Sequence, residues 1–153
     1  MDDNVRRAMK LEANVARKLD DISRKMGGGS VSIGFMGGAP YPDGTPVAAV
    51  AFWNEFGHEG PFPAPPRPFF RNMIEEHQKE WPEEMARTAK ATDYDGKKVL
   101  GIIGDHIKGQ LVQSIMDLTE PALSDVTVAR KGFAKPLVDT GHMKDSVTVK
   151  VDA

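Results

Sequence analysis

The sequence contains no cysteine among its 153 residues. This absence excludes disulfide bonds, thiol nucleophiles and thiolate metal ligands, and it agrees with a reducing compartment. No apolar run approaches the ~20 residues that a membrane-spanning helix needs. The first residues, MDDNVRRAMKLEANVARKL, also lack the apolar segment of a signal peptide. We therefore expect a soluble protein that is made in the cytosol and has no membrane partner.

Charge of one sign is not in excess either, because 20 Lys and Arg residues face 22 Asp and Glu residues. The chain lacks the positive field of a protein that coats DNA. The acidic run at 75–84 is typical of a solvated helix face. No two histidines are spaced to share a metal on one helix turn, and no Gly-x-Ser-x-Gly nucleophile motif occurs. We expect no enzyme, no metal and no cofactor.

The length and composition fit one folded domain, with 40% hydrophobic and 27% charged residues. Its first element, residues 5–26, repeats apolar side chains at steps of three and four, which is the spacing of one helix face. These side chains are Val5, Ala8, Leu11, Val15, Leu19, Ile22 and Met26. The spacing predicts a long N-terminal helix within residues 1–26, which the glycines at 27–29 terminate.

A second helix is predicted over 46–56, with Thr45 at its N-cap, Pro46 in its first turn and Gly57 after its end. A strand is an alternative there, because the apolar run VAAVAFW is too short for its periodicity to decide. Five prolines between 61 and 68 then restrict the backbone to an extended path. We expect residues 58–68 to form a stiff strut.

Two further helical regions follow the strut. In the first, over 68–89, Pro82 must either kink the helix or restart it as a first-turn residue. The second runs from about 99 to 118 and contains Gly101, Gly104 and Gly109. Each interior glycine costs about 1 kcal/mol relative to alanine, so three of them predict that another segment packs closely there.

Alternating apolar residues predict strands at 30–36 and 146–151, and we expect a third strand near 133–138. A short helix, capped by Ser124, is expected in the stretch before residue 132. These elements predict an α+β fold, in which a small and mostly antiparallel sheet packs with several amphipathic helices.

The tripeptide Asp139-Thr140-Gly141 matches the catalytic tripeptide of aspartic proteases. Such enzymes need two carboxylates that share a proton, together with a supporting loop and a flap. Only fourteen residues follow Asp139, and Ile102-Ile103-Gly104 lies upstream in a helical stretch. A local role explains the tripeptide better: Asp139 or Thr140 caps a short helix in GHMKDS.

Three segments resemble the virion-morphogenesis proteins of tailed bacteriophages, which are tail-completion or neck components. The segments are WNEFGHEGPFPAPPRPFFRNMI, PALSDVTVARKG and KPLVDTGHMKDSV. Their order and separation match the family's four motifs over residues 50–151, although His142 stands where the family often has Arg or Lys. The motifs fall on Glu55-Phe56-Gly57, Pro65 to Phe69, Leu123 to Lys131, and Pro136 to Gly141 followed by Ser146-Val147.

The resemblance implies a non-enzymatic structural protein of the virion that forms a ring, expected to be a hexamer, and that is present in the host cytoplasm during assembly. The ring would join the head connector to the tail tube, and DNA would only pass through its channel. We expect Glu55 and Arg67 to pair and to anchor the strut, because Arg offers a bidentate fork. The structural or interface candidates are Glu55, Phe56, Gly57, Arg67, Phe69, Phe70, Thr127, Lys131, Asp139, Thr140 and Gly141.

Two other functions remain open at this point. One is a small adaptor that binds a peptide at its sheet edge and is monomeric. The other is a hydrolase that uses Asp139, which inhibition by a pepstatin-like compound would reveal. Neither alternative accounts for the other three motifs.

Overall fold

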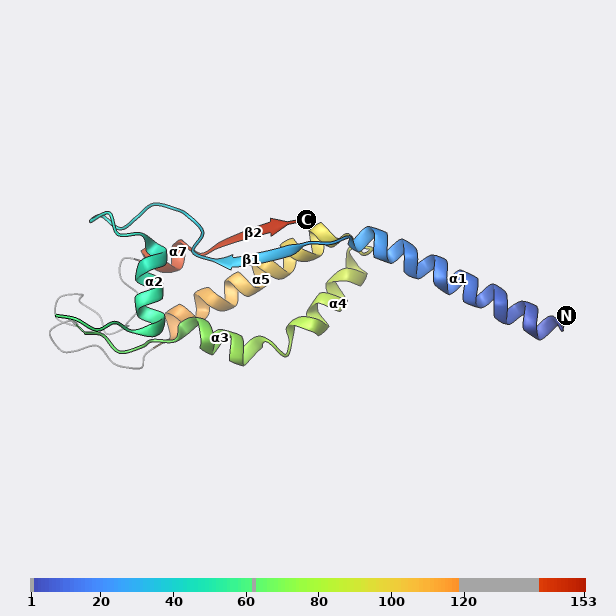
Figure 1. Cartoon of the computed structure of the whole chain (residues 1–153), viewed down its shortest axis with the longest axis horizontal. Helices are drawn as coiled ribbons and strands as arrows, with labels where there is room; N and C mark the ends of the chain where they lie inside the picture. Colours follow the sequence, from blue (N-terminus) through green and yellow to red (C-terminus); the bar gives the residue numbers. More distant parts are fainter. Residues whose placement is uncertain (1, 62, 119–140) are drawn as a thin grey trace.

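The computed structural model describes residues 2–61, 63–118 and 141–153, and these adopt an α+β fold (Figure 1). The described helices are α1 Asp3–Met26, α2 Val47–Phe56, α3 Phe69–His77, α4 Trp81–Ala91, α5 Gly96–Asp117 and α7 His142–Asp145. The described strands are β1 Ser30–Gly34 and β2 Thr148–Asp152. The predicted fold class and the long N-terminal helix are therefore confirmed.

The sheet consists of β1 and β2, which pair antiparallel with Val31 opposite Val151 and Ile33 opposite Val149. This pairing joins segments more than 110 residues apart and confirms the strands predicted near 30–36 and 146–151. Antiparallel pairing lets one face of the sheet lie on the core while the other faces water. The third strand expected at 133–138 and the short helix capped by Ser124 fall outside the described residues.

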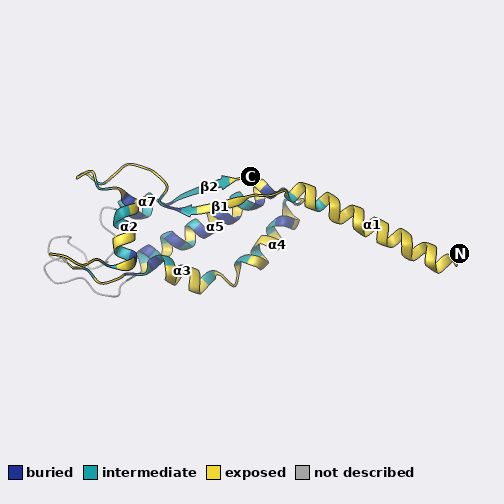
Figure 2. Ribbon diagram, in the orientation of Figure 1, coloured by how far each residue is buried: buried dark blue, intermediate teal, exposed yellow. Residues whose placement is uncertain are grey.

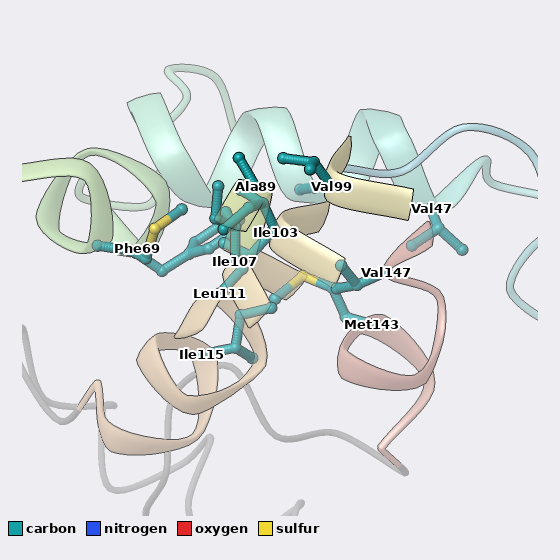
Figure 3. Packing of buried hydrophobic residues seen from close by; sticks show 12 residues of the cluster. Val47, Phe69, Ala89, Val99, Ile103, Ile107, Leu111, Ile115, Met143 and Val147 are labelled. Carbon is teal, nitrogen blue, oxygen red and sulfur yellow. The ribbon is translucent and has the colours of Figure 1, made fainter. Parts of the chain in front are cut away.

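Helix α5 forms the centre of the core, with the sheet on one side and α3 and α4 on the other (Figure 1). Figure 3 shows the buried side chains of this core from close by. Its buried side chains recur every four residues, so they line one face of the helix. They are Val99, Ile103, Ile107, Leu111 and Ile115. Phe69, Met73, Met143 and Val147 come from other elements and pack in the same cluster. One continuous core therefore packs along the buried face of α5.

Gly104 lets the sheet lie directly on α5. A Cβ at this position would come within 2.6 Å of Val149 Cγ1 and 2.7 Å of Val31 Cγ2, one from each strand. Gly101 and Gly109 have nothing within 4 Å of such a Cβ. The prediction of close packing is therefore confirmed at Gly104 and wrong at the other two, which lie where no described segment approaches α5.

The region after Phe69 folds as two helices, because α3 ends at His77 and α4 restarts at Trp81 with Pro82 in its first turn. Pro82 has no N–H and its φ is already helical, so a first turn tolerates it. Trp81 Nε1 donates to Gln110 Oε1 at 2.9 Å, which ties the start of α4 to α5.

Helix α2 begins one residue later than predicted, with Pro46 rather than Thr45 at its N-cap. The main-chain N–H of Thr45 donates to Asp43 Oδ1 at 2.9 Å. This hydrogen bond is the main reason that the pKa of Asp43 lies below its ordinary value. Thr45 therefore belongs to the preceding turn, and the alternative of a strand over residues 46–56 is excluded.

Helix α7 confirms the short helix predicted in GHMKDS. Gly141 is its N-cap residue, with a positive φ of 75°. Asp139 and Thr140, which we expected to cap it, lie outside the described residues. The helix is held by Met143 in the core and by a contact of 2.8 Å between His142 Nε2 and the carbonyl oxygen of Ala39.

Helix α1 projects away from the rest of the molecule and has no buried residue (Figures 1 and 2). Its last turn touches the body, where Lys25 Nζ lies 2.8 Å from Asp93 Oδ2 and Met26 packs beside the core. Across the described ranges, no helix is both long and apolar enough to cross a membrane. Because its apolar residues share one face and none of its residues is buried, α1 is an exposed amphipathic helix.

Candidate functional site

The side chain of Glu55, in the last turn of α2, lies at the N-terminal end of α3. It is buried, and its two carboxylate oxygens accept the main-chain N–H groups of Phe70 at 2.9 Å and Arg71 at 3.2 Å. These N–H groups belong to the first turn of α3 and have no partner within the helix. Pro68, the N-cap residue, makes no side-chain cap. Glu55 therefore caps α3 from a neighbouring helix, where the helix dipole also favours its charge.

The basic partner of Glu55 is Arg71. Its Nε lies 2.8 Å from Glu55 Oε1, and its Nη2 donates to the main-chain oxygen of Glu55 at 2.8 Å. The predicted pair between Glu55 and Arg67 is therefore wrong, because the first turn of α3 holds the carboxylate beside Arg71. Arg67 anchors the same region through its main-chain N–H, which donates to the Asn54 carbonyl at 2.6 Å. Burial lowers the pKa of the Arg67 guanidinium.

Gly57 permits the chain to leave α2 and fold back on itself. Its φ is 74°, and a Cβ would lie 2.7 Å from the Ala64 carbonyl oxygen and 2.9 Å from Pro66 N. His58 and Ala64 exchange two main-chain hydrogen bonds of 3.0 Å. The predicted strut at 58–68 is thus not one extended rod, because His58 and Ala64 lie opposite each other in an antiparallel bridge.

An exposed aromatic face lies on α2, next to this capped junction. Phe52 is 60% exposed and Phe56 is 52% exposed, and their ring centroids are 4.8 Å apart. The guanidinium carbon of Arg71 lies 5.0 Å from the centroid of Phe56, which is a cation–π contact. The same arginine therefore supports both the buried carboxylate and an exposed ring.

A shallow groove of about 350 Å³ opens between α2 and α3. Most of its lining side chains are apolar, and five of them are phenylalanines. The described lining residues are Phe35, Ala48, Ala51, Phe52, Glu55, Phe56, Phe69, Phe70 and Arg71. We call this surface the α2–α3 groove. Exposed aromatic side chains around an apolar hollow are typical of a protein interaction site.

The structure brings together several of the residues predicted from sequence. They are Glu55, Phe56, Gly57 and Phe69 from the first two motifs, and Phe70, which directly follows the second motif. Phe69 is a core residue, because it is 1% exposed, and it also forms part of the floor of the groove. Gly141 belongs to α7 and does not line the groove. Thr127, Lys131, Asp139 and Thr140 lie outside the described residues.

Sequence reasoning missed Phe52 and Arg71. Phe52 precedes Phe56 by four residues, so a helical reading of this run places both on one face. The role of Arg71 had no local signal, because it depends on Glu55, which caps α3 from another helix. A capping box pairs only residues three positions apart. Here the capping carboxylate comes from a residue 15 and 16 positions before its donors.

In the described ranges, no group of three or more His, Cys, Asp or Glu side chains is placed to hold a metal ion. No protein-family model, curated protein or solved structure matches this chain.

Proposed function

We propose that this chain is a non-enzymatic structural subunit of the neck of a tailed bacteriophage. It assembles with copies of itself into a ring, expected to be a hexamer, that joins the head connector to the tail tube. The four motifs and their order support the phage assignment. The site geometry supports the part of the proposal that concerns assembly.

The observation that carries the proposal is the capped junction between α2 and α3. Glu55 and Arg71 hold the end of α2 against the start of α3, while Phe52 and Phe56 stay exposed on the outer face. Large exposed apolar groups on a rigid support are the usual anchors of a protein interface. A neck subunit needs such preformed contacts, because a ring closes only if each interface fixes the rotation between neighbouring subunits.

The proposal also accounts for why the two motifs occur together. Glu55-Phe56-Gly57 supplies the cap, one exposed ring and the reversal, and the segment from Pro65 to Phe69 returns the chain to the start of α3. Removing either motif would leave the aromatic face without its support. Both therefore serve one purpose, which is to present α2 to a neighbouring protein.

A direct test measures the mass of the purified chain by light scattering and images it by negative-stain electron microscopy. We expect ring-shaped particles of uniform size. Phe52→Ser combined with Phe56→Ser should abolish the rings and leave monomers with unchanged far-ultraviolet circular dichroism. Ile102→Ser is the matched control, because Ile102 is a half-exposed apolar residue on α5. That variant should still form rings.

Neck function itself is tested by complementation of phage extracts that lack this protein. Wild-type protein should restore the joining of heads to tails, and the double Phe52 and Phe56 variant should not. A wild-type chain that stays monomeric and restores nothing would contradict the proposal. A monomer that binds an extended peptide would instead support the adaptor function.

A further inference from the structure

Helix α1 leaves an apolar face without a partner. Its apolar side chains share one face and include Leu11 at 65% exposed and Leu19 at 61% exposed, and no residue of the helix is buried. Helices shorter than about 12–15 residues are marginal in water, and longer ones still depend mostly on packing for stability. The 24 residues of α1 therefore present a face that lacks its packing partner.

The α2–α3 groove is the complementary unfilled surface. It is mostly apolar, it is open to solvent, and its volume of about 350 Å³ falls within the range of ligand-binding clefts, roughly 300–1,000 Å³. In Figure 1, α2 lies at the end of the long axis opposite to the N-terminus of α1. The last turn of α1 is held on the body through Lys25 and Met26. In this conformation, α1 cannot reach the groove of its own chain.

One exposed charge on each surface indicates how the two could fit together; the other charged residue of the groove, Glu55, is buried. Glu12 lies four residues after Ala8 and three before Val15, so it sits within the apolar face of α1. Docking this face would bury the carboxylate, which is costly unless a cation meets it. Arg71 is the one cationic side chain among the described residues that line the groove, and its side chain is 56% exposed.

We propose that α1 of one copy docks through its apolar face into the α2–α3 groove of a second copy, with Glu12 beside Arg71. This rests on the self-assembly proposed above and names the surfaces that make it. The contact joins two different surfaces, so it repeats head to tail and closes a ring when the rotation per subunit permits. It is a helix-in-groove contact, in which apolar residues one turn apart serve as anchors.

The first test compares assembly of full-length variants by light scattering over a range of concentrations. Val15→Ser combined with Leu19→Ser should weaken association at least about tenfold, because two anchors are lost. Glu12→Lys should weaken it similarly, because it places two cations together. Ile102→Ser and Glu83→Lys are matched controls on exposed positions of α5 and α4, and both should assemble like wild type. None of the α1 variants removes a buried side chain, so loss of folding would not explain their effect.

The second test locates the contact by cross-linking, which is straightforward because the chain has no cysteine. Copies with Leu19→Cys are mixed with copies with Ala48→Cys and treated with a short bismaleimide. We expect a product of twice the chain mass that contains one copy of each kind. Copies with Asn14→Cys, on the opposite face of α1, should give much less of that product.

The outcomes separate this inference from the proposed function. Rings that persist in the Val15 and Leu19 variant would overturn the α1 contact and leave the neck assignment standing. Cross-links between two Leu19→Cys copies alone would assign α1 to pairing with another α1. Cross-links within one chain carrying both cysteines would assign it to its own groove. A monomeric wild-type chain would overturn both proposals. Both would also be overturned if α1 bound phosphatidylserine vesicles while the protein itself kept the mass of a monomer.

Discussion

Helices α1 and α5 have similar lengths, 24 and 22 residues, and each begins at an aspartate N-cap. Their environments differ completely. Helix α5 buries seven residues between the sheet and two other helices, whereas α1 buries none. Both carry apolar side chains at helical spacing, so this pattern identifies a contact face without naming its partner. In α5 the partner lies within the chain, and for α1 we propose a second copy.

The largest expected difference comes from one leucine on each helix. Leu111→Ala should lower the free energy of unfolding by about 2–5 kcal/mol, because Leu111 is 0% exposed and its loss leaves a cavity. Leu19→Ala should change it by less than about 0.5 kcal/mol, as is usual for an exposed position. Urea melts of monomeric protein measure both. Equal losses would mean that α1 packs on the body in solution.

A second comparison uses Glu55 on α2 and Glu12 on α1. Both helices have an exposed face, but only α2 is tied to the core through its glutamate. Glu55→Ala should cost about 1–3 kcal/mol, since it leaves the N–H groups of Phe70 and Arg71 without acceptors. Glu12→Ala on α1 should leave monomer stability nearly unchanged. A double-mutant cycle with Arg71→Ala should show that the losses at Glu55 and Arg71 are less than additive. Additive losses would contradict their coupling.

Glycines provide a comparison within α5 between its covered and its open sides. Gly104→Ala should destabilise by about 1–3 kcal/mol, because its Cβ would overlap Val31 and Val149. Gly109→Ala should stabilise by up to about 1 kcal/mol, because alanine is the better helix former and nothing stands in its way. Thermal melts should show a lower melting temperature for Gly104→Ala and a higher one for Gly109→Ala. A gain at Gly104 would place the sheet farther from α5 than it is here.

The smallest expected effects come from the two aspartate caps. Asp95 accepts the N–H of Lys98 at 3.1 Å, and Asp95→Ala should cost about 0.5–2 kcal/mol in global unfolding because α5 belongs to the core. Asp2 accepts the N–H of Asn4 at 3.3 Å. Asp2→Ala should only fray the start of α1, which hydrogen exchange detects. A global loss from Asp2→Ala would indicate that α1 folds together with the core.

The elements themselves could be predicted from the sequence with good accuracy. The apolar spacing in α1 and the alternation in β2 depend on residues that are neighbours along the chain, and so does Pro82, which left only a kink or a restart of the helix open. The antiparallel pair and the α+β class followed from them. Part of the candidate site was also predictable, since the two motifs pointed to Glu55 and to the segment before α3.

Only the tertiary structure decided which faces are covered and which groups pair. Glu55 caps a helix that begins more than a dozen residues later, and it selects Arg71 rather than Arg67 because α3 places Arg71 beside the carboxylate. Of three glycines in α5, only Gly104 meets the sheet. Helix propensity, caps and periodicity are local, so the sequence determined where α1 and α5 form. Burial depends on two surfaces brought together from distant parts of the chain, so only the folded structure decided that α5 is core and that α1 is left exposed.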